Sequence, residues 1–129
     1  MYYYDKDYIM RLIHGIARFL ARMLFDKELE DDAFAAVLEE SGLEIDDYLR
    51  RMIDEGKINA AENKLFDLIE SSAWEDRKKA ALVISFYDYL NGKDDEFLAS
   101  ADFPRDEIIT GLEDAMKAIN LEITEYLQI

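Results

Sequence analysis

Apolar residues recur at spacings of three and four along most of this chain, and very few residues interrupt them. Among 129 residues there are one proline and five glycines, the two residue types that most often end helices. Spacings of three and four place apolar side chains on one face of an α-helix. The pattern predicts an all-α fold of antiparallel helical hairpins, either a tetratricopeptide-like array or an irregular bundle of six to seven helices.

Turn and cap residues divide the chain into predicted helices. Asn59 is the expected N-cap of one helix, and Pro104 is the expected first residue of the last. Gly42 and Gly56 are expected to end helices. After a long N-terminal helix, helices are predicted at residues 33–41, 45–55, 59–70, 74–91, 95–100 and 104–119. The side chains expected in the core include Tyr48, Met52, Ala61, Leu65, Trp74, Phe86 and Tyr89.

No segment rich in glycine, serine or proline separates these helices, so residues 1–129 are predicted to form a single helical domain. Its two parts differ in charge. Residues 1–26 are predicted as an amphipathic basic helix, because residues 1–25 carry four lysines and arginines against two aspartates. Residues 27–129 are predicted as an acidic body of helical hairpins, because the whole chain has a formal net charge of -15.

The composition also excludes several classes of function. A surface as acidic as this one repels phosphate groups, so no nucleic-acid partner is expected. The chain has no cysteine, which excludes disulfides and thiolate chemistry. Arginines interrupt the longest apolar stretch, so neither a transmembrane span nor a cleavable signal is expected there, and the cytoplasm is the predicted location.

Few residues are candidates for chemistry. His14 is the single histidine, and it is interpreted as a structural or surface residue because no glutamate lies three or four residues away. Two acidic clusters, at residues 28–32 and 94–96, lack the ligand spacing of a calcium loop and are interpreted as solvated first turns of helices. No catalytic residue, cofactor or metal site is therefore predicted. A small enzyme or metal-dependent regulator that uses clustered carboxylates is the alternative.

The N-terminal helix carries the candidate partner-binding residues, namely Tyr4, Arg11, Arg18 and Arg22. Its apolar side chains cover more than one face, and a helix with so wide an apolar arc needs more than one packing partner. Three hypotheses follow. The helix packs on its own domain, or it pairs with another chain, as a homodimer or as a docking helix in a groove. In the third, it attaches to a membrane surface. The membrane ranks last because anionic lipid repels an acidic body.

A weak internal repeat surrounds two Gly-Lys pairs. Gly56-Lys57 and Gly92-Lys93 each end one amphipathic helix and begin another, and they lie 36 residues apart. This spacing is close to the period of about 34 residues in tetratricopeptide repeats. One interpretation of residues 45–69 is therefore a tetratricopeptide-like hairpin, and the other is a bundle with one well-capped hairpin. Phe97 departs from the repeat, because a small residue is expected at its position.

Three segments of the chain resemble a family of small, acidic, helical bacterial proteins of unknown function. They are residues 7–13 (DYIMRLI), 55–63 (EGKINAAEN) and 86–90 (FYDYL). The resemblance implies a bacterial, cytoplasmic setting and supports the helical hairpins. It implies no activity and no site.

The expected function is that of a non-enzymatic protein-protein interaction module, an adaptor or a scaffold. Its expected binding surface is a groove between hairpins together with the N-terminal helix. An acidic groove would favour a basic protein or peptide as the partner.

Overall fold

The structure is a computed structural model that describes residues 8, 10–15, 18, 43–71 and 73–119. Helices joined by short turns make up these residues, and no strand occurs among them, so the predicted all-α fold is confirmed. The predicted helix at residues 33–41, its Gly42 cap and the acidic cluster at residues 28–32 lie outside the described residues.

Five helices lie in the described part of the chain. They are α3 (Leu43–Asp54), α4 (Ile58–Ser71), α5 (Asp76–Asn91), α6 (Asp95–Ser100) and α7 (Asp106–Ala118). Residues 10–15 are also helical and belong to the predicted N-terminal helix. The predicted ranges therefore match the observed helices to within about two residues at most ends.

The turn between α3 and α4 has the geometry expected of a glycine cap. Gly56 adopts a left-handed backbone with φ of 81°. Its amide donates to the carbonyl of Ile53 at 2.9 Å, and the amide of Lys57 donates to the carbonyl of Met52 at 2.9 Å. These two bonds form a Schellman motif, which satisfies the last carbonyls of the helix. Gly56 therefore ends α3, as predicted.

Two helix starts differ from the predictions. Because α4 begins at Ile58, Asn59 lies inside the helix, and its side-chain amide donates to the carbonyl of Asp102 at 3.4 Å. Asn59 is therefore not the N-cap. The last helix begins at Asp106, two residues after Pro104, whose carbonyl accepts the amide of Glu107 at 2.9 Å in a preceding tight turn.

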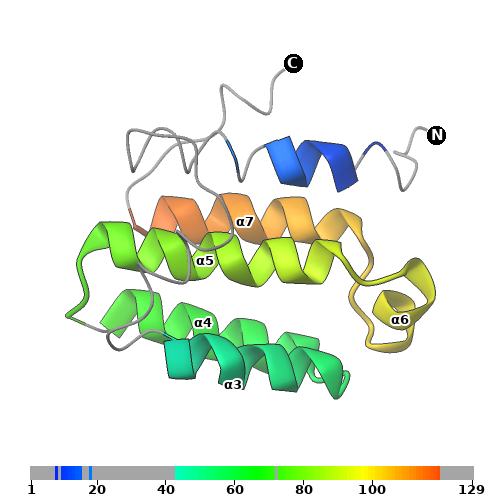
Figure 1. The fold of residues 1–129 in the computed structure, drawn as a ribbon, viewed down its shortest axis with the longest axis horizontal. Coiled ribbons are helices and arrows are strands. Elements are labelled where there is room, and N and C mark those ends of the chain that lie inside the picture. The colour runs from blue at the N-terminus through cyan, green and yellow to red at the C-terminus, as the bar shows by residue number, and fades with distance from the viewer. Residues whose placement is uncertain (1–7, 9, 16–17, 19–42, 72, 120–129) are drawn as a thin grey trace.

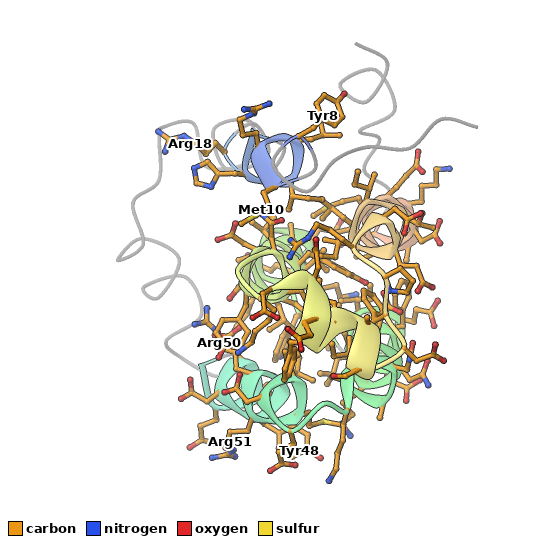
Figure 2. All side chains as sticks on the ribbon, turned by 90° about the vertical axis from the view of Figure 1, so that its right-hand side faces the viewer. Tyr8, Met10, Arg18, Tyr48, Arg50 and Arg51 are labelled. Atoms are coloured by element: carbon orange, nitrogen blue, oxygen red, sulfur yellow. The ribbon has the colours of Figure 1, made fainter. Side chains whose placement is uncertain are left out.

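The helices are arranged in layers (Figures 1 and 2). The hairpin of α3 and α4 forms one layer, α5 and α7 form the next, and the N-terminal helical residues lie on the far side of α5 and α7. Ile13 is fully buried in the core, and the side-chain amide of Asn91 donates to the carbonyl of Met10 at 3.0 Å. The described N-terminal residues thus pack on their own domain.

The helix α5 is the centre of the fold. Every residue from Ala80 to Tyr87 is buried, on all sides of the helix. A helix buried all round needs neighbours on every side. Here they are α3, α7 and the N-terminal helical residues. Leu49 and Ile53 of α3 and Leu112 of α7 are among the buried residues of the same core cluster.

The expected core residues were mostly placed correctly. Ala61, Leu65 and Phe86 are fully buried, and Met52, Trp74 and Tyr89 are partly buried against the core. Tyr48 was predicted wrongly, because its side chain is 45% exposed on α3. Figure 2 shows Tyr48 on the outer side of the α3 and α4 layer, pointing away from the other helices. Helical spacing alone did not distinguish the edge of the apolar stripe from its centre.

The two Gly-Lys turns lead to different helices. The first connects α3 to the 14-residue α4, whereas the second leads to α6, which has only six residues. The long helix packed against α5 is α7, which follows α6. Along the chain, α6 therefore comes between α5 and α7, the two helices of the second hairpin. It contains Phe97, where the sequence departs from the tetratricopeptide pattern. The tetratricopeptide-like interpretation of residues 45–69 stays a prediction.

Arg105 joins the corner where α5, α6 and α7 meet. The side chain is only 5% exposed. Its Nε donates to Asp95 at 2.6 Å, its Nη1 donates to the carbonyl of Asn91 at 2.9 Å, and its Nη2 donates to the carbonyl of Lys93. Since the Asn91 side chain also binds the carbonyl of Met10, this arginine is linked to the N-terminal helix.

Replacement of Arg105 by methionine is expected to lower the free energy of unfolding by about 2–4 kcal/mol, because the carbonyls of Asn91 and Lys93 lose a charged donor. Urea unfolding measures the change. The matched control is Arg51→Met at an exposed position of α3, where a change within about 0.5 kcal/mol is expected. Equal losses in the two variants would contradict this role of Arg105.

Candidate functional site

A pocket of about 180 Å³ lies between α4 and α7. The first of these helices belongs to one hairpin and the second to the other, so the pocket lies between hairpins. Its lining residues recur at helical spacing on one face of each helix. They are Glu62 and Phe66 of α4, and Glu107, Thr110, Gly111 and Asp114 of α7.

Gly111 allows α4 and α5 to approach the backbone of α7. A Cβ atom built on Gly111 would overlap the carboxylate of Glu62 and would lie 2.7 Å from the hydroxyl oxygen of Tyr87. Real Cβ atoms essentially never make such close contacts. The absence of a side chain at this buried helical position therefore creates the space that Glu62 and Tyr87 occupy.

Glu62 is held at the inner end of the pocket. It is half-buried, and it accepts a hydrogen bond from the Tyr87 hydroxyl at 2.6 Å. Burial raises the pKa of Glu62, and the nearby carboxylates of Glu107 and Asp114 raise it further, while the bond from Tyr87 acts in the opposite direction. Burial and the adjacent Glu62 likewise raise the pKa of Tyr87, so this phenol stays a hydrogen-bond donor.

The pocket has the chemistry of a site for a cationic side chain. Its three carboxylates attract positive charge, and the ring of Phe66 provides an apolar wall for the methylene stem of a lysine or arginine. Among the described residues, no group of three histidines or carboxylates is arranged to hold a metal ion. A desolvated carboxyl that faces a pocket together with other charges is a recognised mark of a functional site.

Two of the predicted partner-binding residues, Arg11 and Arg18, do not line this pocket. Arg11 and Arg18 are exposed on the N-terminal helical residues, and Figure 2 shows Arg18 on the side away from α7. Tyr4 and Arg22 lie outside the described residues. His14 is exposed, with its Nδ1 atom 3.9 Å from a carboxylate oxygen of Asp88. The structure therefore does not bring Arg11 and Arg18 to the pocket.

Charged residues also line the contact between α3 and α5, but they are paired with each other. Asp46 is 4% exposed, accepts a hydrogen bond from Ser85 at 2.8 Å, and has an oxygen 3.1 Å from Nε of Arg50. Burial raises the pKa of Asp46, and the Ser85 and Arg50 contacts oppose that effect. The Arg50 guanidinium also lies over the ring of Tyr89, 4.7 Å from its centre.

A second group at the same contact is equally self-contained. Asp54 accepts hydrogen bonds from Lys93 at 2.6 Å and from the hydroxyl of Tyr89 at 2.7 Å, which lower the pKa of its carboxyl. Because Asp46 pairs with Arg50 and Asp54 with Lys93, these charges help to hold α3 against α5. We therefore do not assign this surface as the binding site.

The acidic cluster at residues 94–96 has structural roles that the sequence partly predicted. Asp94 is the N-cap of α6, and its carboxylate accepts the amide of Phe97 at 2.8 Å. Asp95 pairs with Arg105. Both carboxylates thus stabilise the connection between α5 and α7.

The sequence predicts a binding groove between hairpins but does not indicate that Glu62, Glu107 and Asp114 line it. A signal was present, because Gly111 interrupts a helical pattern, and such a glycine often has a packing reason. Tyr87, which donates to Glu62, belongs to residues 86–90, one of the segments whose family resemblance implies no site. Neither residue indicates from sequence alone which carboxylate lies beside it.

The sequence matches the family model of DUF6483, a family of unknown function, over residues 3–120. Searches of curated proteins and of solved structures find no match. Among the described residues, no helix combines the length and the apolarity that crossing a bilayer requires.

Substitution of Gly111 by alanine tests the close approach at the pocket. Alanine favours an isolated helix over glycine by about 1 kcal/mol, but here its methyl group would overlap Glu62 and the buried Tyr87. We expect a net loss of about 1–3 kcal/mol in the free energy of unfolding, typical of overpacking. Urea unfolding of Gly111→Ala and of the exposed neighbour Thr110→Ala measures it, and a Gly111→Ala protein as stable as the parent would contradict the observed packing.

Substitution of Glu62 by glutamine tests the cost of its charge. Because the folded-state pKa lies above the unfolded value, the folded state binds the proton more tightly, and stability falls as pH rises between the two pKa values. Glutamine still accepts the hydrogen bond from Tyr87 but cannot ionise. The stability of Glu62→Gln relative to the parent should therefore increase as pH rises through this window and level off above it. Urea unfolding of both proteins, measured at several pH values from 4 to 8, gives the difference in stability. A difference that does not vary with pH would contradict a raised pKa of Glu62.

Proposed function

Because the chain belongs to DUF6483, a family of unknown function, we propose its function from the pocket itself: a non-enzymatic protein-interaction module that binds a basic segment of a partner protein. The observation that carries the proposal is the pocket between α4 and α7, with three carboxylates and one aromatic wall. A lysine or arginine of the partner would enter it with the methylene stem against Phe66.

The overall charge of the chain supports the same partner chemistry. A formal net charge of -15 produces a negative potential around the protein, which attracts positively charged partners and speeds their association. The pocket concentrates this potential where the carboxylates of two helices face each other. Such binding weakens with added salt, because exposed charges are screened over about 8–10 Å at physiological ionic strength.

The N-terminal helix is a second part of the proposed binding surface. Arg11 and Arg18 project from it into solvent-accessible positions, while Ile13 anchors it to the domain. These arginines suit an acidic part of the same partner, or a second copy of this acidic chain in a homodimer. Tyr4 and Arg22 belong to the same predicted surface.

Binding of a fluorescein-labelled hexalysine peptide, followed by anisotropy at low salt, tests the pocket. Glu107→Gln removes one lining carboxylate, and we expect it to weaken binding roughly two- to five-fold, the range for an exposed ion pair. The matched control is Glu44→Gln, because both glutamates are exposed and lie in the first turn of a helix. The control should leave the affinity nearly unchanged.

Two results would contradict the proposal. If hexalysine does not bind at low salt, the pocket does not accept basic segments. If Glu107→Gln and Glu44→Gln weaken binding equally, the peptide responds to the net charge of the protein and not to the pocket. Labelled hexaglutamate, which should not bind the pocket, serves as the control peptide.

A further inference from the structure

Glu62 differs from the other two carboxylates of the pocket in how it is held. Glu107 and Asp114 are exposed, whereas Glu62 of α4 is half-buried against α5 and α7. Its neighbours are the Tyr87 hydroxyl from α5, at 2.6 Å, and the carboxylates of Glu107 and Asp114 from α7. One hydrogen-bond donor and two negative charges therefore face it.

The repulsion on the negative charge of Glu62 can be relieved in two different ways. A proton on Glu62 relieves both its burial and the repulsion from Glu107 and Asp114. A cationic side chain in the pocket relieves the same repulsion while Glu62 stays ionised. A protonated Glu62 has no negative charge to attract that cation. Protonation of Glu62 and binding of the cation therefore oppose each other.

We infer that a proton and the cationic side chain of the partner compete for Glu62, so that the pocket releases basic segments as the pH falls. This inference rests on the proposed function and adds its regulation. By linkage, a cation that binds the ionised form must lower the proton affinity of Glu62, and protonation must weaken the cation's binding by the same factor.

Tyr87 acts as the positioning residue of this device. Its ring is fully buried and packs edge-on against Phe86, with the ring centres 4.9 Å apart, so its hydroxyl is fixed in place. That hydroxyl donates to the Oε2 atom of Glu62. The contact with the core keeps the carboxyl at the inner end of the pocket in both protonation states, because a neutral carboxyl oxygen also accepts a hydrogen bond.

The affinity for hexalysine, measured from pH 5 to 8 in the parent and in Glu62→Gln, tests the inference. Ordinary carboxyls titrate near pH 4 and the pKa of Glu62 is raised by burial, so a loss of affinity that begins at higher pH in the parent than in Glu62→Gln reports this group. We expect the parent to lose affinity several-fold more than Glu62→Gln over this range, and Glu62→Gln to bind more weakly at pH 8. Glu44→Gln should follow the parent.

Carboxyl carbon chemical shifts provide a readout that does not depend on affinity. In an NMR titration the Glu62 carboxyl should have a lower pKa when saturating hexalysine is present. If the peptide binds but the parent and Glu62→Gln show the same pH dependence and the Glu62 titration does not move, the inference is wrong and the proposed function stands. If hexalysine does not bind at pH 8, the proposed function fails and the inference fails with it.

Discussion

The arrangement of this protein depends on the complete burial of α5. Residues Ala80–Tyr87 have no exposed side, so apolar surface must cover the helix all the way round. The helix α3, the helix α7 and the N-terminal helical residues provide that cover. Removing water from this apolar surface is the main favourable contribution to folding. The layered arrangement follows from the need to cover α5 on every side. Packing against α5 then fixes the positions of the layers on either side of it.

Burial of α5 also decides where polar groups collect, because its own polar side chains need partners. Ser85 faces α3, where it meets Asp46 and Arg50, and the charges there neutralise one another. Tyr87 faces α4 and α7, where it meets Glu62. On that side Glu62 lies near the carboxylates of Glu107 and Asp114, which repel its negative charge. Ser85 therefore helps to hold α5 against α3, whereas Tyr87 holds a carboxylate that lines the pocket.

The corner at Arg105 explains how the second hairpin tolerates an extra helix. The turn after α5 leads into α6, so the chain must change direction twice before α7 begins. The guanidinium of Arg105 binds the carbonyl at the end of α5, a carbonyl in the turn that follows, and the carboxylate of Asp95. A buried arginine satisfies several such groups at once, because it has five N–H donors in a fixed geometry. The same corner reaches the N-terminal helix through Asn91.

The sequence by itself determined the helical class, most helix ends and much of the core, because periodicity and caps such as Gly56 act over a few residues. It also determined the acidic character of the protein. It misplaced Tyr48 and Asn59, since burial and capping at those positions depend on neighbours distant in sequence. Only the tertiary structure decided that Glu62, Gly111 and Asp114 form one pocket. Glu62 and Gly111 come together from different helices, and their contact follows from how α4 and α7 pack around the Tyr87 of α5.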